Sequence, residues 1–215
     1  MDKFKKVMIY CLGLFFLAMG VTFSIKSQLG ISPVNSIPYV LSLISGIEQG
    51  HVIIAVFTVF ILVQVVLLKK DFKLINVFQI VFSTVFGYFV TFTNAIFSFP
   101  SPDSYFLKLG LLFISMILVA VGIIFYLRAE IIPMPAEGCM IAIQKITKKE
   151  FYKIKYSFDV SMVLVSIVLS ILFLGGLNGV REGTIIAAIG IGKIIGFMER
   201  RFKSQIHRLV RFIQT

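Results

Sequence analysis

Long apolar runs, each close to the length of a membrane-spanning helix, recur throughout this chain of 215 residues. A helix needs about 20 mostly apolar residues to cross the ~30 Å hydrocarbon layer of a bilayer. Six runs approach that length: Val7–Ile25, Val52–Leu68, Leu74–Phe97, Phe106–Leu127, Tyr156–Leu174 and Gly183–Phe197. Hydrophobic residues make up 58% of the chain and charged residues only 14%, a balance that excludes disorder and an ordinary soluble domain. The pattern predicts an all-α, multi-pass integral membrane protein with six transmembrane helices.

Two further apolar pieces are shorter, and each contains two prolines. They cover residues 32–45 and 133–146. Apolar pieces of 10–14 residues are typical of re-entrant or interfacial helices and not of full spans. Because proline suits the first turn of a helix, Pro33 and Pro135 are predicted to mark helix starts.

The basic residues are concentrated beside the apolar runs, although the net charge of +11 taken alone would suggest a nucleic-acid partner. Sixteen of the 21 basic residues fall in four clusters: Lys3, Lys5 and Lys6; Lys69, Lys70 and Lys73; Lys145, Lys148, Lys149, Lys153 and Lys155; and Arg200, Arg201, Lys203, Arg208 and Arg211. If both short pieces are re-entrant, all four clusters lie on the cytoplasmic side, as the positive-inside rule prefers. If both crossed fully, the loop at Lys69–Lys73 would lie outside. We therefore expect two re-entrant helices, both termini in the cytoplasm, and no nucleic-acid partner.

An internal repeat becomes visible when the chain is shifted by 102 residues. The aligned pairs include Lys26 with Arg128, Pro33 with Pro135 and Asn35 with Glu137. Residues 1–100 and 104–198 would each hold three spans and one short helix, and an odd number of spans inverts the second half. Inverted repeats with broken helices at corresponding positions are typical of transporters, with the binding site at the repeat interface.

Residues 199–215 are predicted to form a basic amphipathic cytoplasmic tail on the anionic inner leaflet.

Candidate site residues fall at the starts of the short helices and among the few charges inside or beside the spans. Helix N-termini attract anionic or carbonyl groups, and ionisable side chains within a membrane usually face a bundle interior or a water path. The predicted substrate-binding residues are Lys26, Ser32, Asn35, Arg128, Glu137 and Arg181, and the predicted ion-coupling residues are Asp159 and Glu182. Two alternatives stay open: Ser32 and Asn35 can simply cap a helix, and Lys26 and Arg128 can extend to the membrane interface.

Sequence signatures of catalysis and metal binding are absent. The chain has no HExxH or GxSxG motif and no Cys/His cluster. Cys11 and Cys139 lie inside apolar runs, which indicates free thiols. We therefore predict no enzymatic activity, no cofactor and no metal site.

Five segments carry a family resemblance: Leu29–Pro38 in the first half, and Met134–Gly138, Lys149–Phe151, Phe158–Ser161 and Gly179–Thr184 in the second. They resemble segments of the YczE/YitT-like bacterial integral membrane proteins. The resemblance covers nearly the whole chain up to about Phe197. It implies a six-span type of bacterial inner-membrane protein, and so a bacterial cell membrane as the location.

Together these patterns predict a small transporter or permease for an anionic or zwitterionic solute, with its site at the repeat interface. Two alternatives remain: a non-transport accessory or sensor protein of the membrane, and the substrate-binding subunit of a larger transporter. The expected partners are the lipid bilayer and a small-molecule solute. A second copy of the chain or a partner membrane protein is also compatible with the sequence.

Overall fold

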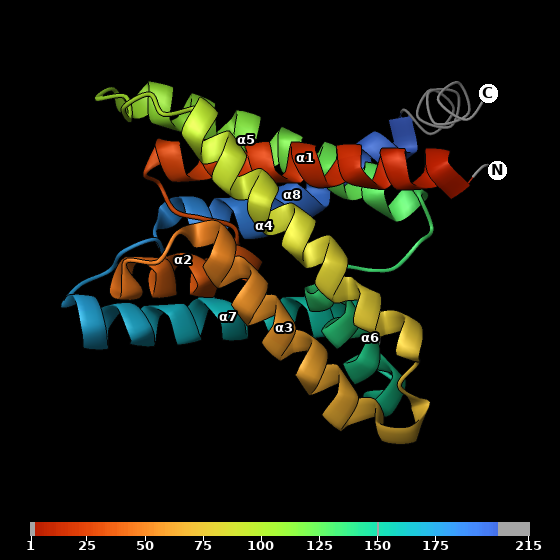
Figure 1. Cartoon of the computed structure of the whole chain (residues 1–215). Coiled ribbons are helices and arrows are strands. Elements are labelled where there is room, and N and C mark those ends of the chain that lie inside the picture. Colours follow the sequence, from red (N-terminus) through yellow and green to blue (C-terminus); the bar gives the residue numbers. More distant parts are fainter. Residues whose placement is uncertain (1–2, 150, 202–215) are drawn as a thin grey trace.

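The computed structural model describes residues 3–149 and 151–201, and all regular structure within them is helical (Figure 1). The α-helices are α1 (Lys3–Ser27), α2 (Pro33–Ser45), α3 (Gln49–Leu68), α4 (Gln79–Ile96), α5 (Tyr105–Arg128), α6 (Pro135–Thr147), α7 (Phe151–Leu174) and α8 (Glu182–Arg201). Two short 3₁₀ helices, η1 (Lys69–Asp71) and η2 (Leu74–Phe78), connect α3 to α4. The predicted tail at 199–215 lies outside the described residues beyond Arg201.

Within the described part of the chain, five helical segments are long and apolar enough to cross a membrane, which agrees with a multi-pass membrane protein. They are Phe4–Ser27, Gln49–Asp71, Leu74–Ile96, Tyr105–Arg128 and Lys153–Leu174. They correspond to the first five predicted spans. The sixth predicted span, at 183–197, lies within α8 but is not one of these five. Because α8 carries Lys193 and four glycines among its 20 residues, a sixth span stays a prediction.

Both short helices occur where the prolines predict them, and they have the same local geometry. Each has 13 residues and begins with its proline in the first turn. At a rise of 1.5 Å per residue, such a helix is only about 20 Å long, less than the hydrocarbon layer. A left-handed residue precedes each helix, Gln28 at φ 54° and Glu130 at φ 52°. Another follows it, Gly46 at φ 70° and Lys148 at φ 58°, so the backbone breaks recur 102 residues apart.

Helices α1 and α5 lie side by side along one edge of the molecule, and we refer to their close contact as the α1–α5 crossing (Figure 1). Glycines allow their backbones to touch. A Cβ atom added to Gly13 would lie 2.8 Å from the carbonyl oxygen of Gly122, and one added to Gly122 would lie 2.7 Å from that of Gly13. On the other side of the crossing, a Cβ on Gly20 would lie 3.0 Å from the carbonyl oxygen of Ser115. Small residues at such contacts are how membrane helices approach closely.

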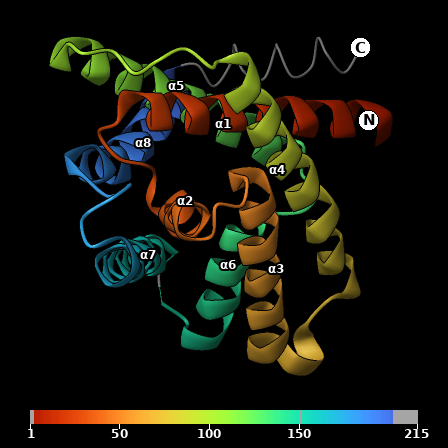
Figure 2. The ribbon, with the colours of Figure 1, turned by 60° about the vertical axis from the view of Figure 1, so that its left-hand side comes forward.

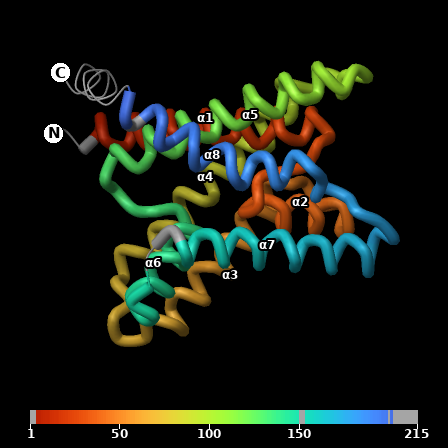
Figure 3. The backbone as a smooth tube through the Cα atoms, turned by 180° about the vertical axis from the view of Figure 1, so that it is seen from behind, coloured from red at the N-terminus to blue at the C-terminus, as the bar shows by residue number. Residues whose placement is uncertain are grey.

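The other helices pack either against this crossing or against one another (Figures 1 and 3). Helix α4 packs against α1, and α8 packs against α5. The short helix α2 lies along α7, while the short helix α6 lies along α3. Each short helix therefore packs against a long helix from the other half of the chain.

Several basic segments gather at one end of the molecule. The ammonium group of Lys145, near the end of α6, lies 2.9 Å from the carboxylate of Asp71 in the α3–α4 connection. The start of α1 contacts the α5–α6 connection, where Lys6 and Glu130 lie 3.9 Å apart. The last described turn of α8 lies near the first turn of α1 (Figure 3). These contacts join the segments of the second and third predicted basic clusters, and place the segment of the fourth beside that of the first.

Candidate functional site

A cavity of about 90 Å³ lies where the N-terminal turns of α2 and α6 converge. All eight α-helices contribute to its lining, and Figure 2 shows α2 end-on with α1, α3, α6, α7 and α8 around it. The polar lining consists of Ser32 and Asn35 from α2, Glu137 from α6, and Lys155 and Asp159 from α7. The rest is mainly apolar, with Phe57, Phe86, Leu17, Val119, Ile191 and Ile195 among the lining residues. We refer to this space as the central cavity.

Three oxygen atoms in the central cavity are buried and have no hydrogen-bond partner within the described part of the chain. They are Oδ1 of Asn35, Oε2 of Glu137 and Oδ1 of Asp159. Buried polar atoms are rarely left unpaired, and each unpaired one costs about 1–3 kcal/mol. The three atoms are all acceptors, so the central cavity is suited to a group that donates hydrogen bonds.

One positive charge balances part of this negative lining. The ammonium group of Lys155 donates a hydrogen bond of 3.1 Å to Oδ2 of Asp159, one helical turn further along α7. This pairing leaves Oδ1 of Asp159 available. With Glu137 included, the central cavity holds two carboxyl groups and one ammonium group.

The capping alternative for Ser32 and Asn35 is not what the structure shows. Ser32 is the N-cap residue of α2 but makes no side-chain cap hydrogen bond. Its hydroxyl oxygen instead accepts a 3.0 Å hydrogen bond from the side-chain amide of Asn35. The N-cap residue of α6 is Met134, which has no strong acceptor. The two side chains of α2 therefore bind each other beside the central cavity.

The chain entering α2 is held by the start of α8. The amide of Ile31 donates to the carbonyl oxygen of Gly179 at 3.1 Å, and the amide of Gly183 donates to that of Leu29 at 2.7 Å. Between them, Gly30 has φ 117°, and a Cβ atom there would lie 2.9 Å from the backbone nitrogen of Thr184. Only glycine fits this close approach without strain. The first turn of α2 is thus fixed relative to α8.

The chain entering α6 is held by a buried pair of glutamines. The amide of Gln64 donates to the carbonyl oxygen of Pro135 at 3.1 Å and to the side-chain oxygen of Gln79 at 2.9 Å. The amide of Gln79 returns a 3.2 Å hydrogen bond to Gln64. The Tyr10 hydroxyl adds a bond of 3.0 Å to the carbonyl oxygen of Ile132. Both short helices are therefore positioned by polar contacts from other helices.

Four of the eight predicted site residues lie together around the central cavity: Ser32, Asn35, Glu137 and Asp159. The other four do not line it. Lys26 lies at the end of α1 with its ammonium group 5.8 Å from the centre of the Phe99 ring, and Arg128 is the last residue of α5. Arg181 donates a 3.0 Å hydrogen bond to the carbonyl oxygen of Gln28, and its Nε lies 3.5 Å from a carboxylate oxygen of Glu182.

Lys155 is the cavity residue that the sequence did not single out, because it belongs to a basic cluster that reads as a topology signal. The sequence signal that could have identified Lys155 is its spacing of four residues from Asp159, since oppositely charged residues at this spacing meet on one helix face. The structure also records Cys11 and Cys139 as free thiols. Among the described residues, no group of three or more His, Cys, Asp or Glu is arranged to hold a metal ion.

Comparison with known families gives one match. Residues 4–200 match a family described as "Family of unknown function (DUF6198)". Searches of curated proteins and of solved structures found no match. The match covers the whole region that contains the central cavity, while the YczE/YitT-like resemblance stays a prediction.

Proposed function

We propose that this chain, which belongs to the DUF6198 family, is a small membrane transporter or permease that binds a zwitterionic solute in the central cavity. The observation that carries the proposal is the set of three unpartnered acceptor atoms where the two short helices meet. A solute or water that donates hydrogen bonds there would offset the cost of burying them. Broken or short helices that meet at a buried site are typical of transporters.

The repeat of local geometry supports two inverted halves, residues 1–100 and 104–198. The helix breaks at Gln28 and Glu130, and those at Gly46 and Lys148, keep the 102-residue spacing. The helix packing follows the same repeat. The short helix of the first half, α2, packs against α7 of the second half, and the short helix of the second half, α6, packs against α3 of the first. Leu17 and Val119, also 102 residues apart, both line the central cavity. A site on the axis between two such halves is what alternating access requires.

The contact between Asp71 and Lys145 supports re-entrant short helices. If α2 and α6 both crossed the membrane fully, the Lys69–Lys73 loop would lie on the opposite side from the end of α6. The 2.9 Å distance between Lys145 and Asp71 favours the arrangement in which both are on the same side. By the positive-inside rule that side is the cytoplasm, and the two termini are then cytoplasmic as well.

The charges of the central cavity favour a zwitterionic solute over an anionic one. Glu137, Asp159 and Asn35 offer oxygen atoms to an ammonium group of the solute. Lys155 and the N–H groups at the helix starts then face its carboxylate. A purely anionic solute would be disfavoured, because it would meet two carboxyl groups and only one ammonium group. Within this proposal Asp159 is the residue for ion coupling, because it binds Lys155 while lying in the cavity.

Solute-dependent stability and uptake test the proposal together. Purified protein is screened for a rise in melting temperature with amino acids and betaines, because a ligand that binds only the folded state stabilises it. Uptake of the stabilising solute is then measured in proteoliposomes. Glu137→Gln and Asp159→Asn should each lower uptake at least tenfold, while Glu130→Gln, an exposed carboxylate outside the cavity, should keep it. Equal uptake in all three variants would refute the proposal.

A further inference from the structure

The chain that leads into α2 separates the central cavity from a second pocket. Ser32 and Pro33 line the central cavity. Gly30 and Ile31, directly before them, line a pocket of about 240 Å³ that is formed with the α7–α8 connection (Figure 3). The two spaces have no lining residue in common. We refer to residues 29–31 as the outer strap, because the proposed topology places this end of the molecule outside the cell.

The outer strap is in direct backbone contact with the start of α8. The two backbone hydrogen bonds described above join it to Gly179 and Gly183. The amide of Ile31 also donates to the hydroxyl oxygen of Thr184, which is fully buried, at 3.2 Å. A Cβ atom added to Gly183 would lie 2.5 Å from the carbonyl oxygen of Leu29. The contact therefore leaves no room for a solute to pass between the strap and α8.

A charged side chain holds the outer strap from the surface. Arg181 is exposed, and its Nη1 donates a 3.0 Å hydrogen bond to the carbonyl oxygen of Gln28, the residue directly before the strap. The side-chain oxygen of Gln28 accepts a further bond of 3.4 Å from Lys108. Exposed hydrogen bonds outside the packed core open at low free energy. This contact can therefore break while the helices stay packed.

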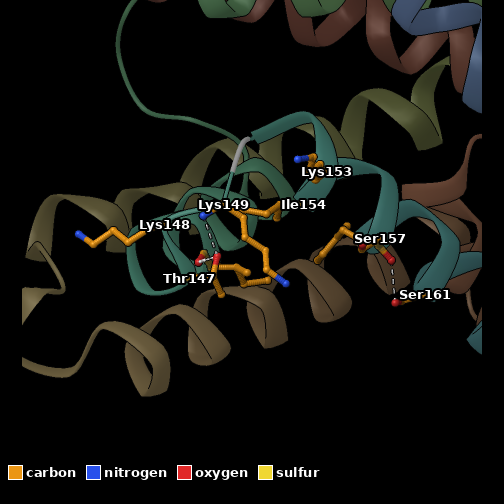
Figure 4. Close-up of a pocket in the computed structure, with 9 residues that line it drawn as sticks. Thr147, Lys148, Lys149, Lys153, Ile154, Ser157 and Ser161 are labelled. Carbon is orange, nitrogen blue, oxygen red and sulfur yellow. Dashed lines mark hydrogen bonds between the residues drawn. The ribbon is translucent and has the colours of Figure 1, made fainter.

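The opposite edge of the central cavity is open to solvent at Lys155. This lysine lines the cavity and yet exposes 44% of its side chain, whereas Asp159, one turn further along α7, exposes 12%. The surface beside Lys155 is hollowed by a groove of about 750 Å³ where α6 meets α7. Figure 4 shows the side chains of Lys148, Lys149 and Lys153 pointing apart around this groove. Solvent therefore reaches the edge that the proposed topology places toward the cytoplasm.

The internal repeat shows that the two edges differ in sequence as well. A shift of 102 residues places residues 131–133 at the position of the outer strap, with Pro133 in place of Ile31. Proline has no N–H group to donate. Within the described part of the chain, no backbone hydrogen bond joins residues 131–133 to the start of α4, the helix equivalent to α8. The outer strap therefore makes contacts that its counterpart cannot fully reproduce.

We propose that the outer strap is the outer gate of the central cavity and that Arg181 is the latch that keeps this gate closed. The proposal rests on the transport function proposed above. In the structure the gate is closed and the cavity faces the cytoplasm, and release of residues 29–31 from α8 opens the cavity to the outside. Alternating access to a site between two halves requires such a barrier on each side in turn.

The reaction rate of a thiol in the cavity, measured from each side of the membrane, tests the gate. The reporter is Asn35→Cys in the full chain, with Cys11→Ala and Cys139→Ala. Membrane-impermeant methanethiosulfonates, one positive and one negative, are added to intact cells or to inverted membrane vesicles. We expect reaction to be faster by about tenfold or more in the vesicles, because a closed path must open before the reagent reaches the thiol.

Two variants should open the gate. Arg181→Gln removes the latch, and the loss of one hydrogen bond shifts the equilibrium between closed and open forms by roughly two- to tenfold. The rate in intact cells should rise by that factor with both reagents. Gly183→Ala places a methyl group against the strap and should raise the rate at least as much. Its matched control is Gly196→Ala on the same helix, where an added Cβ would meet nothing within 4 Å.

Three outcomes would overturn the gate and leave the proposed function in place. One is an unchanged rate in intact cells for both Arg181→Gln and Gly183→Ala. Another is a faster reaction of the reporter in intact cells than in vesicles. The third is a rise with the positive reagent and a fall with the negative one in Arg181→Gln, which is the effect of lost charge alone. If size exclusion shows that Gly183→Ala does not fold, Arg181→Gln decides. No reaction from either side would refute the proposed function, and the gate with it.

Discussion

Gly122→Ala tests the close crossing of α1 and α5, against which α4 and α8 pack. The added Cβ would lie 2.7 Å from the carbonyl oxygen of Gly13 and 2.7 Å from the backbone nitrogen of Leu17. Ordinary contacts of this kind begin at 3.4 Å, so the helices would have to separate by about 0.7 Å. Both neighbouring atoms belong to backbone and cannot move aside by changing rotamer. Overpacking costs about 1–3 kcal/mol, and we expect the upper part of that range.

Thermal unfolding in a mild detergent measures this cost. A loss of 2–3 kcal/mol corresponds to a fall of roughly 4–12 °C in melting temperature for a chain of this size. The matched control is Gly110→Ala on the same helix, where an added Cβ would meet nothing within 4 Å. It should keep or slightly raise the melting temperature, because alanine favours helix over glycine. If Gly122→Ala and Gly110→Ala melt together, the close crossing is wrong.

Two further predictions concern the support of α6 and the topology. Gln64→Leu should lower stability by about 1–3 kcal/mol in the same melting assay, because it leaves Gln79 and the carbonyl oxygen of Pro135 without their partner. Adding Gln79→Leu should cost less than the sum of the two single variants, and strict additivity would contradict the paired arrangement. Single cysteines in a background without the native thiols should label from inside at Asp71 and from outside at Ser104. Outside labelling at Asp71 would mean that the short helices cross fully.

The parts of the fold that could be predicted are those in which one residue type decides the local structure. Pro33 and Pro135 predicted the starts of α2 and α6 because proline fits the first turn of a helix. Hydropathy located five apolar helices, because a run of about 20 mostly apolar residues is what a membrane-spanning helix requires. It was less decisive for α8, where Lys193 and the glycines interrupt the apolar character.

The site could be predicted where a residue's position followed from a helix start, or where a short carboxylate such as that of Asp159 falls inside a span. Ser32, Asn35 and Glu137 belong to the first turns of the short helices, and the structure brings them to one cavity. Charge alone was a weaker guide, because Arg181 binds the carbonyl oxygen of Gln28 and pairs with the adjacent Glu182. Such placements depend on packing between distant segments, which no local pattern encodes.

In the proposed function, α2 and α6 meet at a cavity that water and a solute can enter and that attracts positive charge. The substitution Asn35→Cys, in a chain carrying Cys11→Ala and Cys139→Ala, measures this through the rate at which the new thiol reacts with small charged thiol reagents. Because Glu137 and Asp159 line the same cavity, we expect faster reaction with a positively charged methanethiosulfonate than with a negatively charged one. The preference should fall in the added variants Glu137→Gln and Asp159→Asn. No reaction with either reagent, or faster reaction with the negative one, would show that α2 and α6 do not meet at such a cavity.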